Sequence, residues 1–411
     1  MRENTTMGTA AEISTVLVKP VSADCNLSCT YCFYLPKSKL YPHTKIHRMN
    51  DEVLKKLVVQ MLSISPERVH FCWQGGEPTL AGLEFYKRAV KYQSLFRAPS
   101  QIVENSIQTN GLLINDDWGK FLAKHRFLVG VSLDGPPEIH DFYRKDPRGR
   151  GSYNLVIRCT KILSKYNVDF NILTVLNDRN VKKPKLLYRF LVDMGFKYLQ
   201  FIPCVELDSN GKIAKFSITP EEYGRFLCEV FDEWFNEGSP KIYVRDFEEI
   251  LMTYVLGKTP GCIFSSRCGR YIVVEHNGDV YPCDFFVEPK WLLGNIMKDD
   301  LEDILKSSKF RKFASIKEKL RRKCVGCKWL EYCKGGCPKH WKITNFSHNY
   351  FCQSYKVFFE HAHERFLELK ERLEPTLYSS GNGSSSLGSW DLGGVTLAPG
   401  GGGAYPTRPN D

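Results

Sequence analysis

No apolar run in the sequence reaches about 18 residues, the length that marks a candidate membrane-spanning helix. Residues 1–12 are polar and lack the apolar segment of a secretory signal. We therefore expect a cytoplasmic protein with no membrane partner. Hydrophobic residues make up 43% of the 411 residues and charged residues 25%, which is ordinary for a soluble protein with more than one domain.

The sequence also lacks a nucleic-acid-binding motif, although its net charge is +11. Much of this charge lies in residues 306–328, which read KSSKFRKFASIKEKLRRKCVGCK. We interpret the stretch as a solvated helix face near negatively charged metal–thiolate groups, and we expect no nucleic-acid partner. A zinc-stabilised RNA-binding protein is the alternative from another functional class.

Disulfides seldom persist in the cytoplasm, so the fifteen cysteines require another explanation. Four of them are scattered among apolar neighbours and are interpreted as small buried hydrophobic residues: Cys72, Cys159, Cys204 and Cys228. The other eleven stand in tight groups. Grouped thiols in a cytoplasmic chain indicate metal.

Short β-branched and aromatic runs alternate with helix-period segments over the first half of the chain. We expect strands at residues 14–18, 69–73, 106–109, 128–133, 171–175 and 198–202, and helices at 51–62, 83–94, 116–124, 153–166 and 185–194. This alternation predicts an α/β fold in which crossover helices wrap a parallel sheet. Six repeats favour a partial (β/α)6 barrel over a complete eightfold one.

The rest of the chain differs in composition from this first part. Two further helices are expected at 221–235 and 246–256, before a cysteine-rich stretch that is short in regular elements, as in domains held by metal rather than by a core. The predicted organisation is a flexible N-terminus (1–12), the partial barrel (13–207), a connecting helical segment (208–261), the cysteine-rich domain (262–352), a C-terminal helix (353–374) and a disordered tail rich in Gly and Ser (375–411).

The first cysteine group follows directly after the first predicted strand. Cys25, Cys29 and Cys32 stand in the spacing CxxxCxxC. Three thiolates can hold three irons of a cubane cluster and leave the fourth iron open to another ligand. A zinc site would require a fourth protein ligand close by, and the neighbouring sequence offers none.

CxxxCxxC is the signature of the radical S-adenosylmethionine (SAM) superfamily, which this chain resembles. The resemblance extends to Gly75-Gly76-Glu77-Pro78, which follows the second predicted strand and matches the GGEP motif. In the superfamily the backbone of that motif holds the amino group of SAM. Gly-Gly pairs by themselves usually mark turns, so the combination with the cysteines carries the resemblance.

The downstream cysteines resemble the SPASM domain, which carries two auxiliary [4Fe–4S] clusters. Here the pattern consists of C-x9-G-x4-C followed by C-x2-C-x5-C-x3-C and a last cysteine. The connectivity known from the family implies one auxiliary cluster on Cys262, Cys268, Cys283 and Cys337, and a second on Cys324, Cys327, Cys333 and Cys352. Spacing alone allows many other partitions. One or two structural zinc ions are the alternative, because C-x2-C is common in zinc ribbons.

Within this superfamily the chain most resembles the anaerobic sulfatase-maturating enzymes, through VKPVSADCNLSCTYCFY, FCWQGGEPTLAGLEFY, VGVSLDGPPEIHD, YPCDF and CKGGCPKHW. The resemblance implies that Tyr31, Gly75, Gly76, Glu77, Ser132, Arg144 and Val205 bind SAM, that Tyr34 and Gln74 line the peptide site, and that Asp284 is the general base. Each of these residues also has an ordinary structural interpretation. Ser132 and Asp134 are typical of a turn, and Asp284 is typical of a residue that caps one. Arg144 fits a surface loop, and Tyr31 and Tyr34 fit ordinary side-chain packing.

The resemblance further implies a reaction, cofactors and partners. Members of the family oxidise a cysteine or serine of a sulfatase polypeptide to Cα-formylglycine without oxygen. They use three [4Fe–4S] clusters, SAM and a reducing electron donor of the flavodoxin or ferredoxin type. The alternative within the superfamily is a peptide modifier that forms thioether or carbon–carbon crosslinks. Such enzymes often have an N-terminal peptide-recognition domain, for which the residues before the first predicted strand are too few.

Overall fold

Six parallel strands form the centre of one sheet in the computed structural model, which describes residues 13–379, 390–391 and 396–397. They are β1 (Thr15–Lys19), β2 (Arg68–Trp73), β3 (Ile102–Thr109), β4 (Leu128–Ser132), β5 (Phe170–Leu176) and β6 (Tyr198–Pro203). Each pairs with the next in chain order. The predicted α/β fold with a partial (β/α)6 barrel is confirmed, and each strand lies within a few residues of its predicted position.

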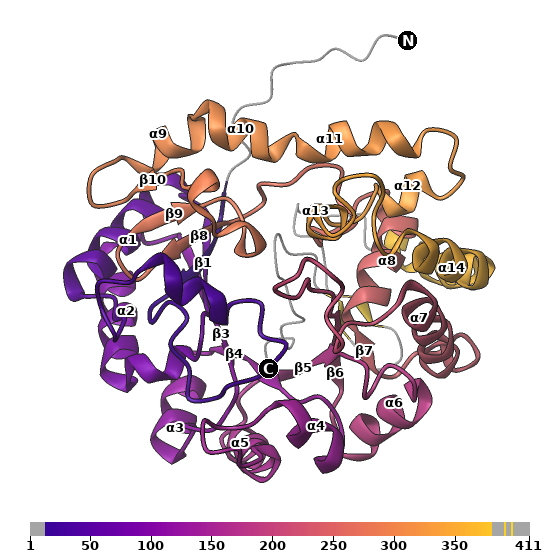
Figure 1. Ribbon diagram of the computed structural model, residues 1–411, viewed down its shortest axis with the longest axis horizontal. Coiled ribbons are helices and arrows are strands. Elements are labelled where there is room, and N and C mark those ends of the chain that lie inside the picture. The colour runs from indigo at the N-terminus through magenta and orange to yellow at the C-terminus, as the bar shows by residue number, and fades with distance from the viewer. Residues whose placement is uncertain (1–12, 380–389, 392–395, 398–411) are drawn as a thin grey trace.

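Helices connect these strands and form a ring around them in Figure 1. They are α1 (Asp51–Ile64), α2 (Leu83–Phe96), α3 (Asp116–Lys124), α5 (Tyr153–Lys165), α6 (Pro184–Asp193) and α7 (Pro220–Phe235). Each buries one apolar stripe against the sheet; in α1 this stripe includes Leu54, Leu57 and Met61. The turn expected after β4 instead leads into a short helix, α4 (Pro137–Tyr143), whose first residue is a proline, as is common at helix starts.

The cysteine-rich segment joins the barrel sheet instead of forming a separate layer. Its strand β8 (Ile272–Glu275) pairs in parallel with β1, and β9 (Asp279–Tyr281) and β10 (Gly294–Asn295) extend the edge. At the other edge β7 (Tyr243–Val244) pairs with β6. The final order is β10-β9-β8-β1-β2-β3-β4-β5-β6-β7.

This arrangement corrects the expectation that metal rather than a core holds the cysteine-rich segment. Ile272, Val274 and Val280 are fully buried in the same apolar cluster as the barrel. The segment also contains more regular structure than expected, namely α9 (Leu301–Lys306), α10 (Ser308–Ala314), α11 (Ile316–Arg321), α12 (Leu330–Cys333) and α13 (Pro338–Lys342). These elements are too short to show a clear period in the sequence.

Two further helices pack beside β6, β7 and α7. Helix α8 (Arg245–Leu256) and helix α14 (Cys352–Ser379) pack together, and α14 also packs along α7. Helix α14 continues beyond its predicted end at residue 374, and β11 (Trp390–Asp391) pairs with β12 (Thr396–Leu397). The N-terminus 1–12 and the other residues of the predicted disordered tail lie outside the described residues. In the described part of the chain, no helix combines the length and apolar character needed to cross a membrane.

The contact of α14 with the barrel depends on Phe366. Its side chain is fully buried, and its ring centroid lies 4.9 Å from that of Phe231 and 5.1 Å from that of Tyr254. Phe366→Ala should lower the free energy of unfolding by about 3–5 kcal/mol through lost burial and the cavity left behind. Urea unfolding followed by circular dichroism would measure this. As a control, Leu95→Ala on α2 removes a side chain that is 65% exposed and should change stability by less than about 0.5 kcal/mol. Equal effects of the two substitutions would contradict this account of the packing.

Candidate functional site

The loop that leaves the carboxyl end of β1 carries Cys25, Cys29 and Cys32, all partly exposed. Main-chain hydrogen bonds shape it: the Cys32 N–H donates to the Cys29 carbonyl at 3.0 Å, and the Ser28 N–H donates to the Lys145 carbonyl at 2.8 Å. Burial raises the pKa of the Cys25 thiol to about 12 and that of Cys29 to about 11. The three thiols thus stand together on one short loop, as the ligands of an iron–sulfur cluster must.

The Gly75–Gly76 turn after β2 contacts this loop through main chain alone. The Gly76 N–H donates to the Ser22 carbonyl at 2.7 Å, and the Glu77 N–H donates to the Asp24 carbonyl at 2.8 Å. A Cβ atom on Gly76 would lie 2.0 Å from the Asp24 carbonyl oxygen, which is closer than any side chain can approach. Glycine is therefore required here, and the turn holds the cysteine loop through main-chain hydrogen bonds.

Glu77 is fully buried, and its carboxylate accepts four hydrogen bonds. The donors are the Thr79 N–H (3.0 Å), the Thr79 hydroxyl (2.6 Å), the Thr109 hydroxyl (2.7 Å) and the Asn110 N–H (2.7 Å). These bonds tie the GGEP turn to the end of β3. Glu77 thus contributes by positioning backbone, because its oxygens are already engaged.

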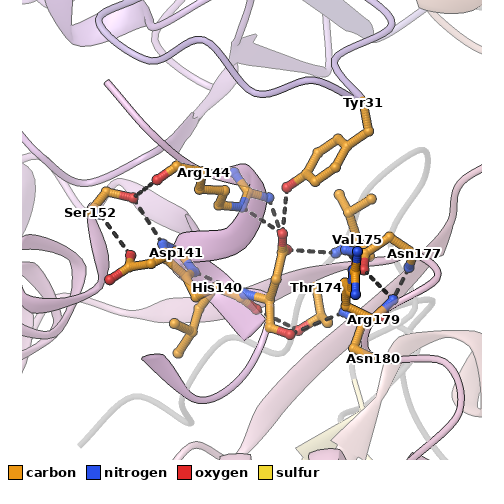
Figure 2. Close-up of polar contacts among 12 residues, drawn as sticks. Tyr31, His140, Asp141, Arg144, Ser152, Thr174, Val175, Asn177, Arg179 and Asn180 are labelled. Carbon is orange, nitrogen blue, oxygen red and sulfur yellow. Dashed lines mark hydrogen bonds and ion pairs between the residues drawn. The ribbon is translucent and has the colours of Figure 1, made fainter. Parts of the chain in front are cut away.

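Asp134, two residues after the end of β4, organises the next part of the site. Its carboxylate accepts hydrogen bonds from the Nε and Nη2 groups of Arg144, at 2.9 and 3.0 Å, and from the Val175 N–H at 3.0 Å. The Tyr31 hydroxyl also donates to it. In Figure 2, dashed lines lead from Tyr31, Arg144 and Val175 to this one carboxylate. Arg144 is therefore buried in an ion pair with Asp134. The alternative interpretation of Arg144 as a residue of a surface loop is wrong.

A second ring of hydrogen bonds holds Asp134 and Arg144 in place. The Asp134 N–H donates to His140 Nδ1 at 3.2 Å, His140 Nε2 lies 3.0 Å from the Ser152 hydroxyl oxygen, and that hydroxyl donates to the Arg144 carbonyl at 2.7 Å. Burial lowers the pKa of His140 to about 4, so the ring is neutral and accepts through Nδ1. The arrangement ties Tyr31, inside the cysteine loop, to the chain that follows β4.

Two further residues that were predicted to bind SAM stand at the ends of strands. Ser132 is the buried last residue of β4, and Val205 is fully buried just after β6. Both stand at the carboxyl ends of parallel strands, the edge where barrel enzymes place their active sites.

Asp284 lies beside Lys19, the last residue of β1. The Lys19 Nζ atom is 2.5 Å from Asp284 Oδ1, donates to Gln74 Oε1 at 2.9 Å, and sits 4.0 Å from the centre of the Tyr34 ring. The structure therefore brings together the three residues predicted for the peptide site and the general base. It adds Lys19, only 1% exposed, which the sequence analysis missed. A lysine that ends an apolar strand was the signal that could have found it.

Two further carboxylate and amide groups complete this cluster. The Tyr34 hydroxyl donates to the Glu275 carboxylate, and Glu275 on β8 stands opposite Lys19 in the strand register. The Gln74 amide donates to Gln108 on β3. Polar side chains thus gather at the carboxyl ends of β1, β2, β3 and β8, with Gln74 directly after β2.

The first set of downstream cysteines gathers around Cys337. Burial, and after it the neighbouring Cys337 thiol, raises the pKa of Cys283, whereas Cys262 is exposed at the surface. Burial also raises the pKa of Cys268 to about 12, and the thiols of Cys337 and Cys262 add to this. The Lys317 ammonium group donates to three carbonyls of the same loop, those of Cys262 (2.7 Å), Ile263 (2.7 Å) and Ser265 (2.9 Å).

The second set surrounds a cavity of about 350 Å³ that opens to the surface. Its walls include all four thiols of the set, Cys324, Cys327, Cys333 and Cys352. The four cysteines of the second set that the resemblance implied thus line one cavity. In the described part of the chain, no three His, Cys, Asp or Glu side chains converge on a point that a single ion could occupy. A cavity walled by four thiols fits the cysteine ligation of an iron–sulfur cluster.

Comparisons with known proteins agree with this geometry. The radical SAM superfamily model matches residues 20–191, and the SPASM iron–sulfur cluster-binding domain matches residues 262–328. The chain is 38% identical over 366 residues to a cysteine-type anaerobic sulfatase-maturating enzyme of Clostridium perfringens, covering 87% of this chain and 99% of that relative. It is also 38% identical over 373 residues to a serine-type anaerobic sulfatase-maturating enzyme of Bacteroides thetaiotaomicron, covering 84% and 89%.

A solved structure shows the same fold. Native anSMEcpe with bound AdoMet superposes with a TM-score of 0.79 at 38% identity, covering 87% of this chain and 99% of that one. Another structure of the same enzyme contains AdoMet and the Cp18Cys peptide, with the same TM-score. The chain therefore belongs to the radical SAM enzymes with a SPASM domain and, among them, to the anaerobic sulfatase-maturating enzymes.

Proposed function

We propose that this chain oxidises a cysteine or serine of a sulfatase polypeptide to Cα-formylglycine without oxygen. The observation that carries the proposal is the position of Asp284, which Lys19 holds at the strand edge beside Gln74 and Tyr34. This edge is shared with the Cys25–Cys32 loop, which also leaves the end of β1. The residues that we propose as proton acceptor and peptide site therefore lie on the same side of the barrel as the Cys25–Cys32 loop.

Eleven cysteines would hold the cofactors in this proposal. Cys25, Cys29 and Cys32 would ligate the cluster that binds SAM, and the two downstream sets would each ligate one auxiliary [4Fe–4S] cluster, three clusters in all. When bound, SAM and its cluster supply a radical that removes a β-hydrogen from the target residue. The protein residues bind and orient the target peptide and accept its proton.

Each proposed residue has a role that its surroundings allow. The main chain of the Gly75–Gly76 turn would contact SAM, and Glu77 holds that turn in place. Tyr31 and Arg144, joined through Asp134, shape the side of the site next to the cysteine loop, with Ser132 and Val205 at the neighbouring strand ends. Tyr34 and Gln74 would orient the target peptide, and Asp284 would accept the proton of the thiol or hydroxyl group.

The first prediction concerns the cysteine loop. Cys25→Ala should abolish formation of 5′-deoxyadenosine in anaerobic assays with dithionite, because the SAM-binding cluster loses one of its three ligands. Chromatography of the nucleoside product measures this. Cys228→Ala, which removes a thiol outside all three sets, is the matched control and should retain SAM cleavage. Persistent cleavage in Cys25→Ala would overturn the assignment of the loop.

The second prediction separates SAM cleavage from product formation. Asp284→Asn should still release 5′-deoxyadenosine but should lose most of the aldehyde, roughly a hundredfold, which is typical for loss of a general base. Asp279→Asn is a control on the same hairpin, because that carboxylate accepts hydrogen bonds from Asn277 and Asn295 instead. A full aldehyde yield in Asp284→Asn would remove this residue from the mechanism.

The third prediction tests the reaction itself. Paired sulfatase peptides that differ only in Cys or Ser at the target position are incubated anaerobically with SAM and dithionite and analysed by mass. Formylglycine should appear as a loss of about 18 mass units from Cys or about 2 from Ser. The product should also react with a hydrazide probe, which requires an aldehyde. A loss of about 2 units without hydrazide reactivity would instead favour a thioether or carbon–carbon crosslink.

A further inference from the structure

Three Lys or Arg side chains are buried in the described part of the chain, and one of them has no carboxylate partner there. Lys19 and Arg144 each pair with an aspartate. Lys317 on α11 is only 1% exposed, and the hydrogen bonds that it donates all go to main-chain carbonyls. It is therefore an exception to the solvated helix face expected for residues 306–328.

The contacts of Lys317 require its charged form. Its Nζ atom lies 2.7 Å from the Cys262 carbonyl oxygen, 2.7 Å from that of Ile263 and 2.9 Å from that of Ser265. Carbonyl oxygens only accept hydrogen bonds, and of the two forms of a lysine only the ammonium has three N–H donors. The carbonyls satisfy these donors without cancelling the net charge. A buried charge of this kind is costly unless an anion lies close by.

Lys317 lies beside the first set of downstream cysteines. One of its acceptors is the main chain of Cys262, and the Cys268 N–H donates to the Ala314 carbonyl at the end of α10. Helix α11 also packs against α13, which begins directly after Cys337 (Figure 1). Burial raises the pKa of the Cys268 thiol to about 12, and the Lys317 charge is the largest influence that opposes this rise. The charge therefore acts on the thiols of this set.

Two other cations near this set are already compensated. The Lys339 Nζ atom lies 2.5 Å from the Glu206 carboxylate, and the Arg245 Nε atom lies 2.8 Å from that of Glu249. An iron–sulfur cluster ligated by four thiolates is itself an anion, and reduction adds one more negative charge. A cluster held by the first set would therefore be the counter-anion that suits Lys317.

We propose that Lys317 is a positioning residue that raises the reduction potential of the cluster held by the first set of downstream cysteines. Its ammonium group stabilises the reduced form more than the oxidised form, because the reduced form carries the larger negative charge. Water does not screen this interaction, since the lysine is buried. In contrast, Lys356, which lines the cavity of the second set, is exposed.

The inference rests on the proposed function, in which the target residue is oxidised by two electrons. The SAM-derived radical first removes one hydrogen atom from its Cβ. The S–H or O–H bond then breaks and the proton passes to Asp284, while one electron leaves and the C–S or C–O bond becomes a double bond. That electron reduces the cluster whose ligand, Cys283, directly precedes Asp284. A buried cation beside this cluster favours the transfer.

Redox titration of the full reconstituted chain, followed by electron paramagnetic resonance, tests the proposal. Every sample carries Cys25→Ala, Cys29→Ala and Cys32→Ala, so that only the two downstream clusters give signals. In this background K317M should lower the midpoint potential of one cluster by at least about 59 mV, which is a tenfold change in the equilibrium constant for one-electron reduction. K317R keeps the positive charge and should retain the potential.

A second lysine on the same stretch provides the matched control. Lys309 on α10 is exposed and donates to the Leu292 carbonyl at 2.8 Å, so K309M should leave both potentials unchanged. In the chain with all its cysteines, K317M should still release 5′-deoxyadenosine but should form less formylglycine per nucleoside than K317R or K309M.

Unchanged potentials in K317M, or an equal shift in K317M and K317R, would overturn the proposal. Equal loss of iron from these two variants would also overturn it, because Lys317 would then only shape the loop. Loss of iron from K317M alone would support the need for the charge. A chain that produces no formylglycine would refute the proposed function, whereas the redox titration requires no peptide and would still report on Lys317.

Discussion

The close contact between Gly76 and the main chain of Asp24 is the constraint on which the site depends. Because a Cβ atom at residue 76 would overlap the Asp24 carbonyl, the turn after β2 and the cysteine loop after β1 can approach through backbone alone. Two main-chain hydrogen bonds then join them. The buried Glu77 carboxylate extends the connection to β3. Three successive strand ends thereby act as one rigid support for the three thiols.

Strand β1 connects this support to the peptide site. Its last residue, Lys19, contacts Asp284 and Gln74, while the loop that follows it carries the cysteines. The pairing of β8 with β1 places Glu275 opposite Lys19 and so brings the downstream hairpin, with Cys283 and Asp284, to the same edge. The site therefore requires the cysteine-rich segment to complete the barrel sheet, and the shared apolar core stabilises that pairing.

The two downstream cysteine sets differ in their surroundings. The set around Cys337 lies next to Asp284, and the Lys317 ammonium holds its loop through three carbonyls. The set around the 350 Å³ cavity is open to the surface and bordered by cations. The first set is therefore tied to the strand end that carries Asp284, whereas the second borders an open cavity.

Features that depend on residues close together in the chain could be predicted from the amino-acid sequence. The alternation of strands and helices follows from side-chain periodicity, and the spacing of Cys25, Cys29 and Cys32 follows from one short loop. Short elements such as α4 and β8 to β10 were not predicted, because they contain too few residues to show a side-chain period. Other features appear only in the folded chain: Asp134 joins Tyr31 to Arg144, Lys19 pairs with Asp284, and four downstream cysteines line one cavity. These contacts join residues far apart in the chain, and their geometry exists only once the sheet and its shared core have formed.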